Sequence, residues 1–100
     1  MDAVVIAHAV SSGTRSATDV VEAALARAEE NAHLGAITHL QHEHAKERAR
    51  LIDASVASGK NPGRLSGVPI VVKDNIAQAG QPLGCASKML DGYVAPRTAT

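Results

Sequence analysis

The residue types best suited to chemistry stand at positions 73–75, where an apolar run ends in Lys73, Asp74 and Asn75. A lysine that ends a buried strand is desolvated, which disfavours its charged form, and a neutral amine can accept a proton. We therefore interpret Lys73 as a candidate base, with Asp74 and Asn75 positioning it and the following loop by hydrogen bonds. By residue type alone, an exposed lysine and two turn residues are the commoner outcome.

Other reactive side chains give weaker signals. Cys85 has no histidine partner at a recognisable spacing, so we predict a small buried thiol rather than a nucleophile. His39, His42 and His44 are close in sequence, but residues two apart on a helix point to different faces, so we predict a solvated helix and no metal site. The sequence has no Gly-x-Ser-x-Gly elbow, phosphate loop or dinucleotide fingerprint.

The element that must position Lys73 is the apolar run itself, for which we predict a strand over residues 68–73. Both faces of this strand are apolar until Lys73, which is typical of a strand covered on both sides in an α/β sheet. Pro69 lacks an N–H and suits the beginning of a strand or an edge. Lys73 would then lie at the carboxyl end, where ligands and catalytic groups gather in open α/β sheets.

Helical patterns precede this run. Asp2 can cap a short first helix, Ser16 begins a capping signal for a helix over residues 17–31, and Gly35 can take a left-handed conformation after it. A weak strand is predicted over residues 35–40 and a charged helix over 41–58, followed by solvated loops and one helical turn within 85–90. The predicted apolar stripes consist of Val20, Val21, Ala24, Leu25 and Ala28, and of Ala45, Ala49, Ile52 and Val56.

Composition narrows the class of protein. Ten basic and ten acidic residues give a formal net charge of zero, which argues against direct nucleic-acid binding. The chain has no Trp or Phe, so its core must use small aliphatic residues, and we expect marginal stability at 100 residues. A single cysteine, no signal peptide and no apolar run of membrane-spanning length predict a cytoplasmic location and no membrane association.

Two segments carry a family resemblance. The run LSGVPIVVKDNI (residues 65–76) and the continuation CASKMLDGYV (residues 85–94) resemble the lysine-bearing region of the amidase signature family. Within that family the chain is similar to the amino-terminal part of the A subunits of glutamyl-tRNA(Gln)/aspartyl-tRNA(Asn) amidotransferases. The resemblance is specific over residues 65–94 and covers the rest of the chain more generally.

The resemblance implies both a fold and an activity. It implies an α/β fold in which helices are followed by a buried strand of a mixed sheet, with residues 1–100 forming the amino-terminal part of an amidase domain. The family cleaves amide bonds with a serine nucleophile, a bridging serine and a lysine, and Lys73 matches that lysine. The A subunits hydrolyse glutamine and pass ammonia to a partner subunit, which uses ATP and magnesium. The implied partners are the carboxyl-terminal remainder of the fold, the other amidotransferase subunits and glutamine.

The two catalytic serines of relatives lie in a glycine-serine-rich segment beyond the region that residues 1–100 match. We therefore expect no amidase activity and poor stability from this chain alone. Two alternatives stay open, a piece of an amidase for another small-molecule amide and a non-catalytic interaction module or remnant, in which the apolar helix stripes bind a partner.

Overall fold

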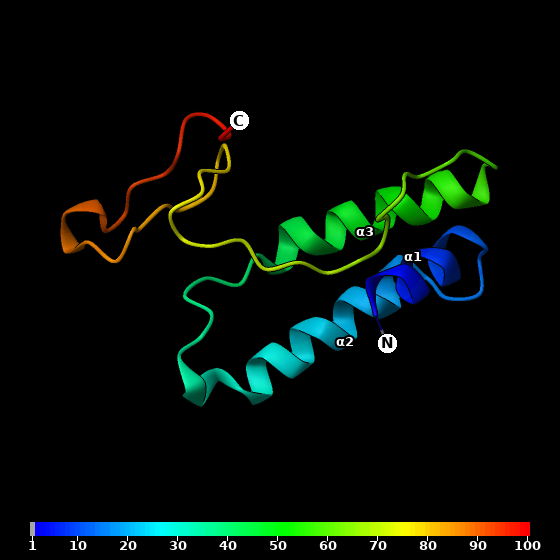
Figure 1. Cartoon of the computed structure of the whole chain (residues 1–100), viewed down its shortest axis with the longest axis horizontal. Helices are drawn as coiled ribbons and strands as arrows, with labels where there is room; N and C mark the ends of the chain where they lie inside the picture. Colours follow the sequence, from blue (N-terminus) through cyan, green and yellow to red (C-terminus); the bar gives the residue numbers. More distant parts are fainter. Residues whose placement is uncertain (1) are drawn as a thin grey trace. The chain divides into compact units, whose positions relative to one another are not determined.

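The computed structural model describes residues 2–100, and the chain divides into two compact units, Met1–Pro69 and Ile70–Thr100. The first unit contains three α-helices, α1 (Ala3–Ser11), α2 (Ala17–Glu30) and α3 (His42–Ala57), and a short 3-10 turn, η1 (Ala32–Leu34) (Figure 1). The second unit contains one 3-10 turn, η2 (Lys88–Leu90). Between residues 2 and 100 there is no β-strand, only an isolated antiparallel bridge between Pro82 and Val94.

The helices begin where the capping signals predict. The Asp2 carboxylate accepts a hydrogen bond from the Val5 N–H (2.9 Å), and the Ser16 hydroxyl accepts one from the Asp19 N–H (3.0 Å). Each contact satisfies a backbone donor that has no partner within its own helix. Gly35 follows η1 with a left-handed φ of 64°, as predicted. The helical predictions for residues 17–31 and 41–58 are thus confirmed within a residue or so at each end.

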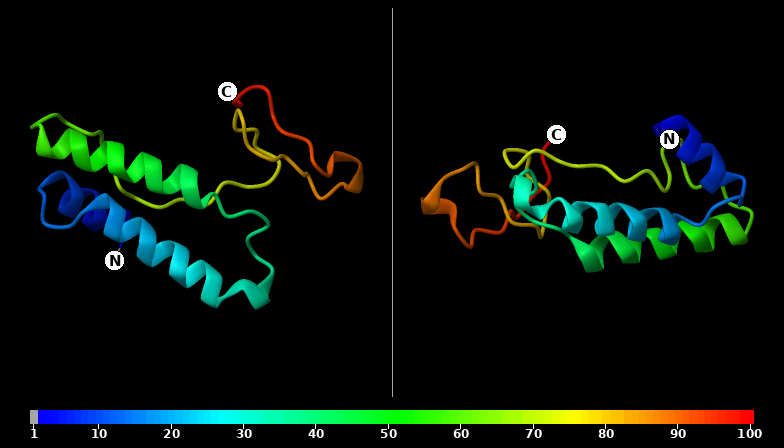
Figure 2. Two further views of the ribbon diagram at one scale, coloured as in Figure 1. Left: turned by 180° about the vertical axis from the view of Figure 1, so that it is seen from behind. Right: turned by 90° about the horizontal axis from the view of Figure 1, so that it is seen from below.

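Helices α2 and α3 form an antiparallel pair, and both views of Figure 2 show them side by side. Their predicted apolar stripes face each other, and Val10 of α1 completes the contact. The core is small because most of its side chains are alanine or valine, and close helix packing depends on those small side chains. The buried cluster consists of Val10, Ala17, Val20 and Ala49, with Ile6, Val21 and Ile52 packed against it.

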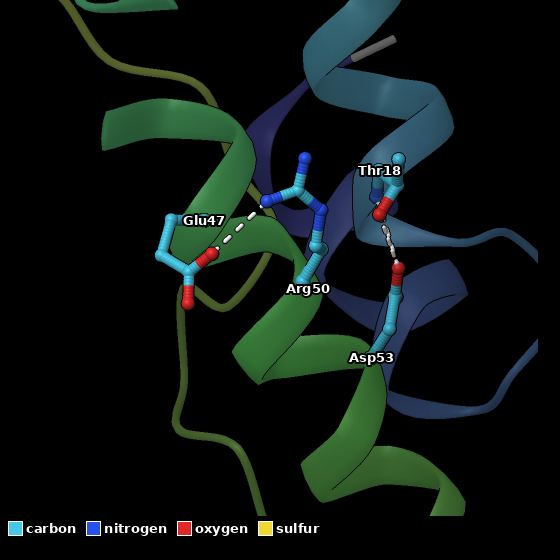
Figure 3. Close-up of polar contacts among 4 residues, drawn as sticks. All are labelled: Thr18, Glu47, Arg50 and Asp53. Carbon is cyan, nitrogen blue, oxygen red and sulfur yellow. Dashed lines mark hydrogen bonds and ion pairs between the residues drawn. The ribbon is translucent and has the colours of Figure 1, made fainter. Parts of the chain in front are cut away.

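A polar contact that the sequence patterns do not predict joins the far end of α3 to the beginning of α2. The Asp53 carboxylate accepts hydrogen bonds from the Ala17 N–H (2.7 Å), the Thr18 N–H (3.1 Å) and the Thr18 hydroxyl (2.7 Å), the last of which is drawn in Figure 3. Partial burial alone would raise the pKa of this carboxyl group. The Thr18 hydroxyl and then the two N–H groups stabilise the charged form more strongly, so the pKa of Asp53 is lowered.

After α3 the chain folds back against α1. Ser66 is buried, and its hydroxyl donates to the carbonyl oxygens of Pro62 and Gly63. Gly67 follows with a φ of +79°, and a Cβ built there would lie 2.6 Å from a Val10 methyl carbon. A glycine is therefore required at position 67 for both backbone conformation and space.

The predicted fold class is wrong, because the described residues contain no mixed sheet. Residues 68–73 form no strand, and the side chains of Ile70 and Val71 are 74% and 76% exposed. A strand needs a hydrogen-bonded neighbour, and the described residues provide none beside this segment. The weak strand predicted over residues 35–40 is also absent, and this segment is mostly exposed. The described structure is helical, with no mixed sheet.

Candidate functional site

The candidate site residues all lie in the second unit, Ile70–Thr100, drawn from yellow to red in Figure 1. This unit is held mainly by backbone hydrogen bonds. Gly80 and Leu83 donate to Ala95 and Tyr93 (2.8 and 3.2 Å), and Ala95 donates back to Gln81 (3.0 Å). Ala95 is its one buried hydrophobic side chain among the described residues. The unit therefore has local order but little apolar core.

Lys73 opens a turn in this unit. Its carbonyl oxygen accepts a hydrogen bond from the Ile76 N–H (2.9 Å), so the backbone reverses over residues 73–76. The Lys73 side chain is exposed, and its ammonium makes no ion pair or hydrogen bond with any residue that the structure describes. The desolvated strand end predicted for Lys73 is therefore not observed, because the segment before it is itself exposed. Its role as a base stays a prediction.

The polar groups of Asp74 bond to residues other than Lys73. Its carboxylate Oδ1 accepts a hydrogen bond from the Gly84 N–H (3.0 Å), and its carbonyl oxygen accepts one from the Cys85 N–H (3.1 Å). The residue is half-buried, as is Gly84. We call this pair of contacts the Asp74 bridge. It connects the turn at residues 73–76 to the loop at residues 84–85.

Gly84 fits this bridge closely. A Cβ built on Gly84 would lie 2.6 Å from Oδ2 of Asp74, a separation that real Cβ atoms essentially never show. Its φ is not in the left-handed region, so a preference for glycine here comes from the space beside Asp74 and not from the backbone conformation. The sequence pattern indicates only a loop at Gly84, and nothing in the sequence pairs this residue with Asp74 ten positions earlier.

Two other candidates lie apart from this bridge. Asn75 is exposed in the turn, and no hydrogen bond of its side chain is present among the described residues. The prediction of a buried thiol at Cys85 is wrong, because Cys85 is exposed. Cys85 and Ala86 have left-handed φ values of 48° and 56°, and both are exposed in a unit whose one buried hydrophobic side chain among the described residues is Ala95.

The histidines are distributed rather than clustered. His42 lies at the beginning of α3, and its Nε2 is 2.6 Å from a carboxylate oxygen of Glu29 at the end of α2. His39 is exposed in the loop before α3, and His44 is exposed on the helix. Across residues 2–100, no group of three or more His, Cys, Asp or Glu side chains is placed to hold a metal ion. No helix in the described part of the chain is long and apolar enough to cross a membrane.

This arrangement places an exposed lysine side chain on a turn whose next residue, Asp74, is hydrogen-bonded to a neighbouring loop. The amine of Lys73 is accessible to a reacting group, while the Asp74 bridge ties down the turn that carries it. No serine or cysteine among the described residues is hydrogen-bonded to the Lys73 amine, so these residues show no nucleophile that Lys73 could activate.

Known proteins match this chain over most of its length. The model of the family described as "Amidase" matches residues 19–100. The curated relatives include A subunits of glutamyl-tRNA(Gln) amidotransferases. One from Chlamydia abortus is 47% identical over 94 residues, covering 93% of this chain and 19% of the relative. One from Chlorobaculum parvum is 54% identical over 63 residues, covering 63% of the chain and 13% of the relative.

A third such relative, from Gloeobacter violaceus, is 42% identical over 92 residues, covering 91% of the chain and 19% of the relative. The chain thus spans about a fifth or less of the length of the curated relatives it matches. No solved structure matches the chain.

Proposed function

Because the chain belongs to the amidase family, we propose that it supplies the lysine of an amidase active site, with Lys73 as the proton acceptor. The observation that carries this proposal is the family match over residues 19–100, which includes Lys73 and its flanking residues. The exposed position of the Lys73 side chain supports it, because an accessible amine can meet groups from another part of the domain.

The chemistry proposed for Lys73 is proton transfer. Its neutral amine takes a proton from a bridging serine, which in turn takes the proton of a nucleophilic serine hydroxyl. The nucleophile then attacks the carbon of a carboxamide, the proton held by Lys73 returns through the bridging serine to the amide nitrogen, and this nitrogen leaves as ammonia. Water then hydrolyses the acyl-serine ester, which releases the carboxylic acid and restores the serine hydroxyl. Both serines come from the part of the amidase domain that this chain does not match, so residues 1–100 alone are expected to be inactive.

We further propose that the carboxamide is that of glutamine. The support is that the named relatives are subunits of glutamyl-tRNA(Gln) amidotransferases and are up to 54% identical to this chain. In this function, ammonia from glutamine passes to a partner subunit, which binds ATP and magnesium and amidates the mischarged Glu-tRNA(Gln) or Asp-tRNA(Asn). The chain then acts in the cytoplasm and contacts the remainder of its domain and the other subunits.

The exposed apolar side chains of the second unit support assembly with more of the domain. Ile70, Val71 and Met89 are 74%, 76% and 94% exposed, and burial of such apolar side chains against a partner surface is favourable.

Reconstitution tests this proposal. Residues 1–100 are co-expressed with the part of the Chlamydia abortus relative that the chain does not match, and ammonia release from glutamine is measured. We expect turnover from the combination and none from residues 1–100 alone. A co-purified, folded combination that releases no ammonia from glutamine would refute the proposal.

The same assay separates the alternatives. An amidase for another small amide would hydrolyse simple carboxamides, such as a primary fatty or aryl amide, in preference to glutamine. An interaction module would bind the remainder of the domain without turnover of any amide. The family match favours catalysis over the interaction module, because it includes the lysine segment.

A further inference from the structure

Asp74 follows the candidate base directly, and an acid at that position can serve in two ways. As a counter-ion, it would hold the Lys73 ammonium and favour the charged amine, which opposes a role as base. As a backbone anchor, it would fix the turn that carries Lys73 and leave the amine without a fixed charge beside it. The contacts of Asp74 distinguish these roles.

The carboxylate of Asp74 accepts a hydrogen bond from a backbone N–H and makes no ion pair with Lys73 among the described residues. Its Oδ1 accepts the Gly84 N–H at 3.0 Å, and no ion pair joins it to Lys73 in the described part of the chain. Hydrogen bonds from an N–H to a charged carboxylate are stronger than those between neutral groups. The second contact, from the Cys85 N–H to the Asp74 carbonyl oxygen, fixes the same two segments at a neighbouring point.

Gly84 makes this arrangement possible. Its missing side chain leaves the space that Oδ2 of Asp74 occupies, since a Cβ would lie only 2.6 Å from that oxygen and 3.4 Å from the carboxyl carbon. With a larger residue at position 84, either its Cβ or the Asp74 carboxylate must shift, and a shift of the carboxylate alters the hydrogen bond that the same residue's N–H donates to Oδ1. The donor and the space are therefore supplied by the same residue.

We propose that Gly84 is a positioning residue for the lysine of this amidase site, acting through Asp74 as a backbone anchor and not through a lysine counter-ion. The inference rests on the proposed function, because positioning matters only if Lys73 is the base. It adds a residue to the site that lies outside the lysine segment, and it assigns Asp74 one of its two possible roles.

Amide exchange tests the anchor without any need for activity. In residues 1–100, solvent exchange of the Gly84 and Ile76 amides is measured by NMR for the parent chain and for Asp74→Ala, Gly84→Ala and Asp74→Asn. We expect exchange at both amides to rise about tenfold in the first two variants, the factor for loss of roughly one hydrogen bond. Asp74→Asn retains an acceptor oxygen and should stay within about threefold of the parent.

The double variant provides the matched control. If the two residues act through one contact, Asp74→Ala combined with Gly84→Ala should be no worse than Asp74→Ala alone, because removing the carboxylate removes the overlap. Additive effects would overturn the proposal. So would faster exchange at Gly84 with no change at Ile76, because the turn that carries Lys73 would then not depend on the anchor.

Kinetics in the reconstituted amidase separate the two roles of Asp74. As an anchor, Asp74→Ala and Gly84→Ala should lower kcat about tenfold or more with little change in KM, and Asp74→Asn should keep the parent pH profile. As a counter-ion, Asp74→Asn should shift the acidic limb of kcat/KM to lower pH, which would overturn the proposal. If the parent enzyme shows no turnover, the proposed function fails, and with it the positioning role of Gly84, while amide exchange still tells whether the anchor exists.

Discussion

Replacing Asp53 with alanine should destabilise the helical unit more than any other single change to a charged residue of α3. The change removes three hydrogen bonds that the carboxylate accepts from the first turn of α2, at 2.7 Å from the Ala17 N–H and 3.1 and 2.7 Å from the Thr18 N–H and hydroxyl. It also leaves two N–H groups at a helix N-terminus without their protein partner.

The expected cost follows from these contacts. Loss of a capping side chain costs about 0.5–2 kcal/mol, and a hydrogen bond to a charged group contributes about 1.5–3 kcal/mol. Asp53 is only partly buried, so water recovers much of the sum. We expect a loss of about 2 kcal/mol in the free energy of unfolding, which is about 30-fold in the unfolding equilibrium and about 8–16 °C in Tm for a chain of this size.

Urea and thermal unfolding followed by far-ultraviolet circular dichroism measure this loss. Glu47→Ala is the matched control, because Glu47 is an exposed acid of the same helix whose ion pair with Arg50 (3.0 Å) is also exposed (Figure 3). Such a pair is worth at most about 1 kcal/mol, so the control should stay close to the parent. Equal stability of Asp53→Ala and Glu47→Ala would refute the reasoning.

Three further outcomes are expected. The free energy of unfolding of Asp53→Asn should differ most from that of the parent above about pH 4. The pKa of Asp53 is lowered in the folded state, so its charged form stabilises the fold above the unfolded-state pKa, and this stabilisation is lost as pH falls through the folded-state value. A difference in urea titrations that grows below about pH 4 contradicts this. Gly67→Ala should cost about 1–3 kcal/mol more than Gly13→Ala, since both have a φ of +79° but only position 67 meets Val10; equal thermal unfolding contradicts it. Ile70→Asn should change unfolding of residues 1–100 by less than about 0.5 kcal/mol because the side chain is exposed, and a larger loss would show that it is packed.

The sequence predicts the helices well because their determinants are local. The caps at Asp2 and Ser16 and the left-handed Gly35 depend on neighbours within a few residues, and the structure confirms them. The apolar stripes also predict the faces on which α2 and α3 meet. The Asp53 contact escapes prediction because its partners lie 35 and 36 positions away and depend on how the two helices pair.

The strand predicted over residues 68–73 is absent because a strand depends on other segments and not on local sequence alone. Its two apolar faces are a pattern for a buried strand, but the hydrogen bonds and cover that make a strand come from other segments. The described residues contain no such neighbour, so Ile70 and Val71 remain exposed and Lys73 is not desolvated. Gly84 likewise has no local signal, since its requirement comes from the carboxylate of Asp74, which only the folded loop brings to it.

The central claim is that Lys73 is the base of an amidase site, and the most direct test is turnover of the reconstituted enzyme with Lys73→Ala. Lys88→Ala is the matched control, because Lys88 is an exposed lysine in the same unit. We predict that Lys73→Ala lowers kcat for ammonia release from glutamine by at least about 100-fold, the usual scale for loss of a general base, while the Lys88→Ala enzyme stays near the parent. Retention of parent-like turnover by a folded, assembled Lys73→Ala enzyme would contradict the account.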